Sequence, residues 1–288
     1  MQHYRSRIEA ELLKAIERMG ERNRLRDACE YALTTGGKRL RPILVLLIAD
    51  AIGKGYDAMP AALSVEYFHT ASLIADDLPC MDDDDERRNR PSLHKAFGES
   101  VSILASYTLI AEGYGGIYEN GRKMKEKAGS EADAAALLCL EAATRCAGIN
   151  GATSGQFLDL NPPDSSLDTI RKIIYQKTVT LFEITFLFGW HFGGGDPASV
   201  EAVKKCAYHL GMAFQIADDL QDHLQDASQM SEINIAAICG AEKAAFLFEE
   251  ERQGFISRLK ELGLWNRSFQ EVAEWLRSLA PLPFSNYP

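Results

Sequence analysis

Apolar residues recur at intervals of three and four along nearly the whole chain. This spacing gathers apolar side chains on one face of an α-helix, so each segment that shows it predicts a helix. The segments are 7–33, 59–75, 99–118, 131–149, 167–191, 198–220, 240–263 and 267–279. The run Ile43–Ile48 also suits a strand, although Pro42 before it suits the first turn of a buried helix. Because no stretch has the composition of a linker, we expect one all-α domain over residues 1–288, a single-domain helical bundle.

The charge balance narrows the possible functions. The 288 residues carry a net charge of −10, which disfavours nucleic acid as a partner. The longest apolar runs, such as 43–49, are too short to span a bilayer, and the N-terminal segment 1–20 lacks the apolar core of a signal peptide. The six cysteines form no CxxC pair and indicate reduced thiols. We therefore expect a cytoplasmic protein without stable membrane insertion.

Two clusters of aspartates suggest metal binding. The stretch LIADDLPCMDDDDERRNRP (73–91) holds seven acidic residues, and ADDLQD (217–222) places Asp218 and Asp222 one helical turn apart. Acidic runs are more often solvated loops, and that interpretation suits Asp83–Glu86. It does not suit Asp76–Asp77, which directly follow an apolar helix. Crowded carboxylates repel one another unless a cation lies between them, and Mg²⁺ prefers such oxygen ligands together with phosphates.

Basic residues flank the first cluster on both sides. GGKRLRP (36–42) precedes it, and Arg87, Arg88 and Arg90 follow it. Arginine matches the geometry of phosphate oxygens, and glycines allow a phosphate to approach the backbone. Taken alone, the glycine pair would be an ordinary helix C-terminus followed by exposed lysine and arginine side chains. Together with two metal-binding clusters, the basic residues predict a substrate rich in phosphate, such as two separate diphosphates.

These motifs together resemble the trans-isoprenyl diphosphate synthase family. The matching stretches are GGKRLRP, HTASLIADDLPCMDDDDERRNRPSLHKAFG (69–98), GQFLDL (155–160), Lys177–Thr178 and FQIADDLQD (214–222), within a resemblance over residues 5–265. The resemblance implies an all-α bundle around a deep central cavity and a homodimer. It also implies a Mg²⁺-dependent, head-to-tail condensation of an allylic diphosphate with isopentenyl diphosphate.

The resemblance assigns roles by matching position. The expected metal ligands are Asp76, Asp77, Asp82, Asp218, Asp219 and Asp222. Arg87 and Lys177 would bind the allylic diphosphate, and the groups expected to hold isopentenyl diphosphate are Lys38, Arg41, His69 and Arg88. Gln215, Thr178 and Gln156 would line the reacting centre, where the released diphosphate serves as the base. A lone histidine such as His69 is more often a core residue. Its assignment to the substrate site rests on the neighbouring residues, which match the family motif.

The length of the product is predicted from residues upstream of the first aspartates. Ala71 lies five residues before Asp76, roughly 7.5 Å along the helix, with Ser72 beside it. Family members that make a C15 product tend to have an aromatic residue at the position of Ala71. Alanine therefore favours a longer product, most simply C20 geranylgeranyl diphosphate. The alternative is a C15 farnesyl product, with Tyr107 as the floor of the cavity.

Four positions depart from the family pattern. Ala75 replaces a common histidine, Asn89 a glycine, Tyr107 an aspartate, and Glu232 a phosphate-binding lysine. These differences keep two other functions open, a class I terpene cyclase and a non-catalytic partner subunit of a prenyl synthase. A cyclase needs no second diphosphate site, and a subunit of that kind is expected to lose motif aspartates. The C-terminal segment 280–288 suits either a cover over the active site or a frayed end.

Overall fold

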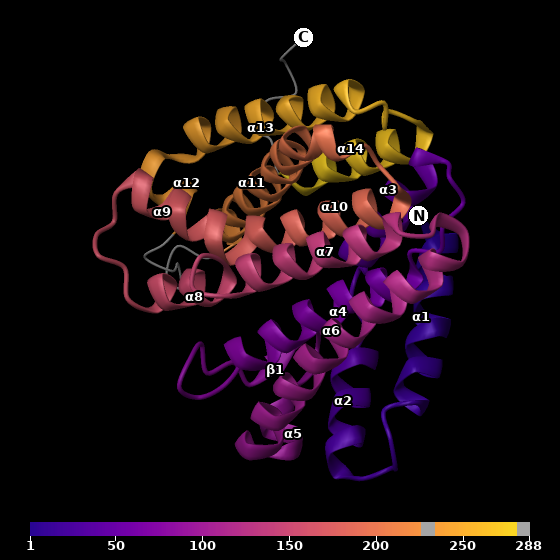
Figure 1. Cartoon of the computed structure of the whole chain (residues 1–288). Coiled ribbons are helices and arrows are strands. Elements are labelled where there is room, and N and C mark those ends of the chain that lie inside the picture. Colours follow the sequence, from indigo (N-terminus) through magenta and orange to yellow (C-terminus); the bar gives the residue numbers. More distant parts are fainter. Residues whose placement is uncertain (226–233, 281–288) are drawn as a thin grey trace. The chain divides into compact units, whose positions relative to one another are not determined.

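The computed structural model describes residues 1–225 and 234–280, and these residues are almost entirely helical (Figure 1). The N-terminal half contains α1 (Gln2–Glu17), α2 (Arg24–Thr34), α3 (Leu40–Ile52), α4 (Met59–Asp76), α5 (Leu93–Phe97) and α6 (Glu99–Ala128). The remaining helices are α7 (Glu131–Ala147), α8 (Ala152–Leu160), α9 (Leu167–Ile174), the π-helical turn η1 (Tyr175–Val179), α10 (Thr180–Gly193), the 3-10 turn η2 (Pro197–Ser199), α11 (Val200–Gln225), α12 (Ile235–Cys239), α13 (Ala241–Glu261) and α14 (Arg267–Leu279). The all-α prediction is confirmed.

Local chemistry explains where the observed elements differ from the expected ones. The segment 7–33 forms two helices because Gly20 adopts a φ of +92° and Asn23 caps α2, accepting from the backbone N–H of Leu25 at 3.0 Å. The run Ile43–Ile48 is helical, with Pro42 in the first turn of α3. The short helices α5, α8 and α12 escaped prediction, as did a hairpin of β1 (Glu86–Arg87) and β2 (Arg90–Pro91). Within the described residues, no helix combines the length and apolar character that a bilayer span requires.

Two compact units make up the chain. Unit 1 comprises Met1–Leu140 and Phe188–Gly195, and unit 2 comprises Glu141–Leu187 and Asp196–Pro288. The prediction of one domain over 1–288 and that of a central cavity stay predictions. In unit 1, α4 packs along α6, and small residues allow the close approach. A Cβ added to Gly113 would lie 2.6 Å from the ring of Phe68, and one on Gly116 would lie 2.2 Å from Ser64 Oγ.

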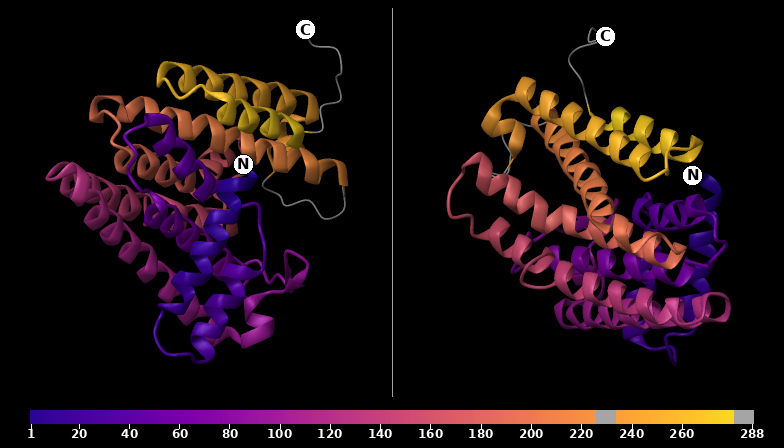
Figure 2. Two further views of the ribbon diagram at one scale, coloured as in Figure 1. Left: turned by 90° about the vertical axis from the view of Figure 1, so that its right-hand side faces the viewer. Right: turned by 45° about the horizontal axis from the view of Figure 1, so that its top comes forward.

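Unit 2 is built around α11, which packs against α13 and α14; these helices lie together in both views of Figure 2. Buried aromatic side chains fill this core. Phe182 lies 5.6 Å from Phe214 between ring centroids, and Phe214 stacks on Trp275 at 6.2 Å. The helix α8 packs on η1 through Gly155, where a Cβ would lie only 2.2 Å from the backbone nitrogen of Lys177. This contact fixes the position of the Lys177–Thr178 pair within unit 2.

Candidate active site

The first aspartate motif folds back on itself at the end of α4. The helix ends at Asp76, and the backbone N–H of Asp82 donates to the carbonyl of Asp76 at 2.9 Å. The N–H of Asp83 donates to the carbonyl of Leu78 at 3.2 Å, which closes the turn. Two expected metal ligands that are six residues apart in sequence are therefore neighbours. Carboxylates at a helix C-terminus also oppose the helix dipole, so a cation there would relieve two repulsive interactions.

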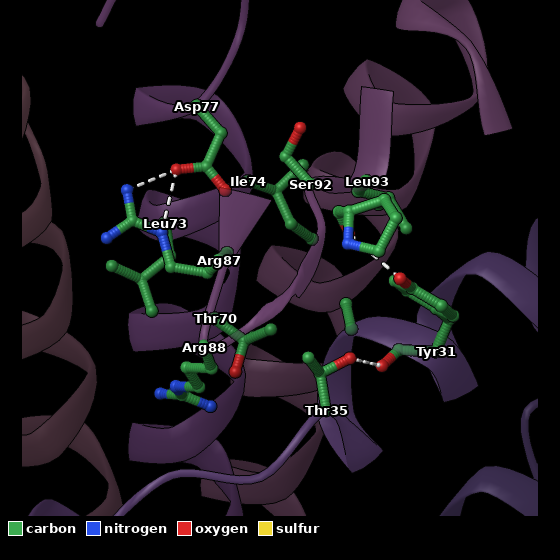
Figure 3. Close-up of a pocket in the computed structure, with 12 residues that line it drawn as sticks. Tyr31, Thr35, Thr70, Leu73, Ile74, Asp77, Arg87, Arg88, Ser92 and Leu93 are labelled. Carbon is green, nitrogen blue, oxygen red and sulfur yellow. Dashed lines mark hydrogen bonds and ion pairs between the residues drawn. The ribbon is translucent and has the colours of Figure 1, made fainter. Parts of the chain in front are cut away.

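Asp77 is buried and points toward Arg87. Its side chain accepts a hydrogen bond from Arg87 Nε at 2.9 Å (Figure 3). Arg87 also pairs with Asp84 at 2.8 Å. Burial raises the pKa of the Asp77 carboxyl, and the hydrogen bond from Arg87 opposes that rise. Asp84 is thus part of an ion-pair network. Its neighbours Asp83 and Asp85 are exposed, as expected of a solvated loop, although Asp85 also pairs with Lys95.

The hairpin that carries these arginines turns through left-handed backbone. Arg88 has a φ of 57° and Asn89 one of 60°. Asparagine tolerates this conformation better than most residues, so the replacement of the family's glycine by Asn89 leaves the turn intact. The hairpin places Arg88 over the glycine pair, where it donates to the carbonyl of Gly36. A Cβ on Gly37 would lie 2.6 Å from Arg88 Cζ, so the space above Gly37 holds a guanidinium.

His69 lies among arginines inside unit 1. Its Nε2 atom is 3.4 Å from Arg41 Nη1. Burial lowers the pKa of His69 well below 6.5, and Arg41 and Arg88 lower it further. The neutral ring and its cationic neighbours create a region of positive potential, which suits a diphosphate. Lys38, also expected here, is exposed at the start of the same segment.

A buried ion pair supports this basic region, and the sequence analysis assigned it no role. Arg39 and Glu66 pair with side chains that are only 3% and 2% exposed. Arg39 also donates to the carbonyl of Leu33 and adopts a φ of 53° between α2 and α3. Glu66 lies three residues before His69 on α4. A single acidic residue within this apolar helix was the sequence signal that could have indicated a buried ion pair.

A small cavity lies beneath the arginines (Figure 3). It encloses about 30 Å³ and is lined by groups that include Asp77, Arg88 and Thr70. Thr70 Oγ1 is buried and has no hydrogen-bond partner among the described residues. A volume of this size accommodates about two waters and is far too small for a diphosphate.

One further group of residues in unit 1 has metal-ligand chemistry. Ligand atoms of Asp83, Asp85 and His94 lie within 4.8 Å of one another. Lys95 Nζ already pairs with Asp85 at 2.6 Å, and His94 Nδ1 lies 3.1 Å from Ser92 Oγ. The cluster is a possible cation site, but protein groups neutralise part of it.

Unit 2 gathers the second aspartate motif around Asp219, which is 6% exposed. Gln215 Nε2 donates to Asp219 Oδ1 at 3.0 Å, and Thr178 Oγ1 donates to Gln215 Oε1 at 2.9 Å. Burial raises the pKa of Asp219 to about 6, although hydrogen bonds from Gln215 and the backbone of Ile235 oppose the rise. On the same helix, Asp218 is half-buried and Asp222 is exposed.

Lys177 lies in the π-helical turn η1 and pairs with Asp159 on α8. A π-helical turn inside a helix often marks a functional position, because it displaces side chains from the regular helical spacing. The sequence analysis missed Asp159, although it lies in the GQFLDL stretch and three residues after Gln156 on α8. Glu232 and the C-terminal segment 281–288 lie outside the described residues.

The comparisons with known proteins agree with this geometry. The profile described as polyprenyl synthetase matches residues 22–236. The chain belongs to the polyprenyl synthetase family. It is 34% identical over 229 residues to a putative geranylgeranyl pyrophosphate synthase 8 of Arabidopsis thaliana, covering 77% of this chain and 62% of the relative. It is also 34% identical over 219 residues to farnesyl diphosphate synthase of Bacillus subtilis, covering 75% of this chain and 72% of that relative.

The fold is shared with solved members of the family. A geranyltransferase structure from Legionella pneumophila superposes with a TM-score of 0.86 at 27% identity, covering 98% of this chain and 96% of that one. The matches thus span most of this chain, but the chain spans less than two thirds of the length of the Arabidopsis relative. Relatives named for C20 and for C15 products both occur, so family membership leaves the product length open.

Proposed function

We propose that the chain is a Mg²⁺-dependent prenyltransferase that joins an allylic diphosphate to isopentenyl diphosphate. The observation that carries the proposal is the folded first motif, in which the backbone N–H of Asp82 donates to the carbonyl of Asp76 near the half-buried Arg87. Carboxylates for metal and arginines for phosphate in one unit suit a reaction in which a diphosphate departs. Of the six predicted ligands, those that would hold Mg²⁺ are Asp76 and Asp82 in unit 1 and Asp218 and Asp222 in unit 2. Asp77 pairs with Arg87, and Asp219 is considered below.

Mg²⁺ bound by these carboxylates would stabilise the negative charge on the departing diphosphate. Arg87 and Lys177, paired with Asp77 and Asp159, would turn from carboxylate to phosphate oxygens as the allylic substrate binds. The isopentenyl diphosphate would lie against Lys38, Arg41, His69 and Arg88. Gln215, Thr178 and Gln156 would orient the reacting carbons, and the released diphosphate would take the proton.

We infer a C20 product from the environment of Ala71. Ala71 is buried on α4, and its carbonyl accepts from Ser106 Oγ of α6 at 3.1 Å. The neighbouring Tyr107 is 65% exposed, which argues against Tyr107 as the floor of a cavity. Ala71 and Ser72 beside it are both small, so neither residue supplies the aromatic side chain that is typical of C15-forming members.

Incubation with labelled isopentenyl diphosphate and each allylic primer tests this proposal. We expect geranylgeranyl diphosphate as the main product, and a C15 product from Ala71→Phe because a phenyl ring at this position would block further growth of the prenyl chain. Ser72→Ala serves as a conservative control and should leave the length unchanged. A wild-type product that stops at C15 would refute the C20 assignment.

We also propose that the chain forms a homodimer through α6. Large apolar side chains on this helix are exposed, namely Ile103, Leu104, Tyr107, Ile110 and Tyr118. Several exposed apolar side chains on one helix suggest an interaction surface. Sedimentation of the wild-type chain should give a dimer, and Leu104→Glu should give a monomer. A wild-type monomer at micromolar concentration would contradict the proposal.

A further inference from the structure

We propose that Asp219 is a positioning residue that orients Gln215 and anchors the start of α12, rather than a direct ligand of Mg²⁺. The inference rests on the proposed function, because it concerns the groups expected to line the reacting centre. It differs from the resemblance, which makes Asp219 a metal ligand.

Asp219 already uses its oxygens within unit 2. Oδ1 accepts from Gln215 Nε2 at 3.0 Å, and Oδ2 accepts from the backbone N–H of Ile235 at 2.8 Å. The carbonyl oxygen of Asp219 accepts from Asn234 Nδ2 at 3.0 Å. The side chain of Asn234 in turn caps α12, accepting from the N–H of Ala237 at 2.9 Å. Coordination of a metal by the carboxylate would compete with the bonds from Gln215 and Ile235, at a residue that is only 6% exposed.

The carboxylate also determines the direction of a chain of hydrogen bonds. An ionised carboxylate can only accept, so Gln215 must present its NH₂ group to Asp219 and its carbonyl oxygen to Thr178. The hydroxyl of Thr178 must then donate to Gln215 Oε1, at 2.9 Å. Asp219 therefore fixes which polar atoms of Gln215 and Thr178 remain available to a substrate.

Neighbouring aspartates on α11 differ from Asp219 in exposure. Asp218 is half-buried and Asp222 is exposed, and the two lie one turn apart on one face of the helix. A metal ion can reach this pair without breaking the hydrogen bonds that Asp219 accepts. Within the motif, Asp218 and Asp222 would thus bind the metal, and Asp219, which lies between them in sequence, would position Gln215.

The substitution Asp219→Asn tests the inference because it keeps the shape of the side chain but replaces the oxygen that accepts from Gln215 with a nitrogen that donates. The introduced asparagine can accept from Ile235 with its oxygen and donate to Gln215 with its nitrogen, which forces the Gln215 amide to flip. We expect Mn²⁺ binding with inorganic pyrophosphate, measured by electron paramagnetic resonance, to stay within about twofold of wild type. We expect kcat to fall about tenfold or more, with KM little changed. The control Asp218→Asn should weaken Mn²⁺ binding about tenfold or more.

The double variant Asp219→Asn with Gln215→Glu restores the original direction. The introduced glutamate accepts both from the new asparagine and from Thr178, so kcat should recover by about fivefold or more over the single variant. Asp219→Ala removes every acceptor of the side chain, so hydrogen exchange of the Ile235 amide should accelerate about tenfold or more. The inference is wrong if Asp219→Asn weakens Mn²⁺ binding as much as Asp218→Asn does, or if the double variant shows no recovery.

Failure of the proposed function would look different. If the wild-type chain forms no product, the condensation proposal fails, while Mn²⁺ binding and the exchange of Ile235 still judge the role of Asp219. Unchanged exchange in Asp219→Ala would then refute the anchoring of α12.

Discussion

Removal of the buried carboxylate of Glu66 should destabilise the chain severely. Its pairing with Arg39 joins two side chains that are 3% and 2% exposed. Glu66→Gln keeps the shape but leaves the Arg39 guanidinium buried without a counter-charge, a change that typically removes about 3–5 kcal/mol from the free energy of unfolding. For a chain of this length, that corresponds to a fall in melting temperature of about 6–15 °C. Urea unfolding followed by circular dichroism measures the loss.

Two controls sharpen this prediction. Replacing both partners, as Arg39→Met with Glu66→Leu, removes the charges together and should recover most of the lost stability. Lys125 and Asp133 form a surface pair whose side chains are 57% and 59% exposed, so Lys125→Met should change stability by less than about 1 kcal/mol. A loss below about 1 kcal/mol for Glu66→Gln would refute the reasoning, because the buried charge would then be well solvated without its partner.

One further prediction is made for each unit. Gly155→Ala should cost about 1–3 kcal/mol, seen as a lower urea midpoint, because its Cβ would lie 2.2 Å from Lys177 N and force α8 away from η1; an unchanged midpoint would contradict that packing. Burial and nearby arginines hold the pKa of His69 in the folded chain well below 6.5. Below pH 6.5 the unfolded chain therefore binds a proton at this histidine more readily than the folded chain does. The free energy of unfolding should fall as the pH is lowered from 6.5 toward the folded-state pKa. The wild type should therefore lose up to about 1.4 kcal/mol per pH unit more than His69→Asn in this range, and equal slopes would show that His69 titrates normally.

The long helices could be predicted from sequence because each buries a periodic apolar face. In α11 and α13 the 3.6-residue period persists over many turns, which a chance arrangement of apolar residues would rarely produce. The helices α8 and α12 are nine and five residues long, too short to establish a period. The helix α8 depends on close packing at Gly155, and α12 depends on its cap at Asn234; neither feature changes the pattern of apolar residues.

The residues of the site could be predicted by type, but their partners could not. Motif spacing indicated Asp77, Lys177 and Gln215, yet nothing in the spacing showed that Asp77 holds Arg87 or that Lys177 holds Asp159. Such pairs join segments that only tertiary folding brings together. Asp219 illustrates the limit most clearly, because sequence places it among metal ligands while three hydrogen bonds tie it to Gln215, Asn234 and Ile235.

Release of pyrophosphate from an allylic diphosphate is the most direct test of the central claim. The purified chain would be assayed with isopentenyl diphosphate present or omitted, and with Mg²⁺ present or chelated. We predict pyrophosphate release, together with an elongated prenyl product, only when both isopentenyl diphosphate and Mg²⁺ are present. Release without isopentenyl diphosphate would indicate a cyclase, and release only after addition of a second protein would indicate a partner subunit; either result would contradict the proposed synthase.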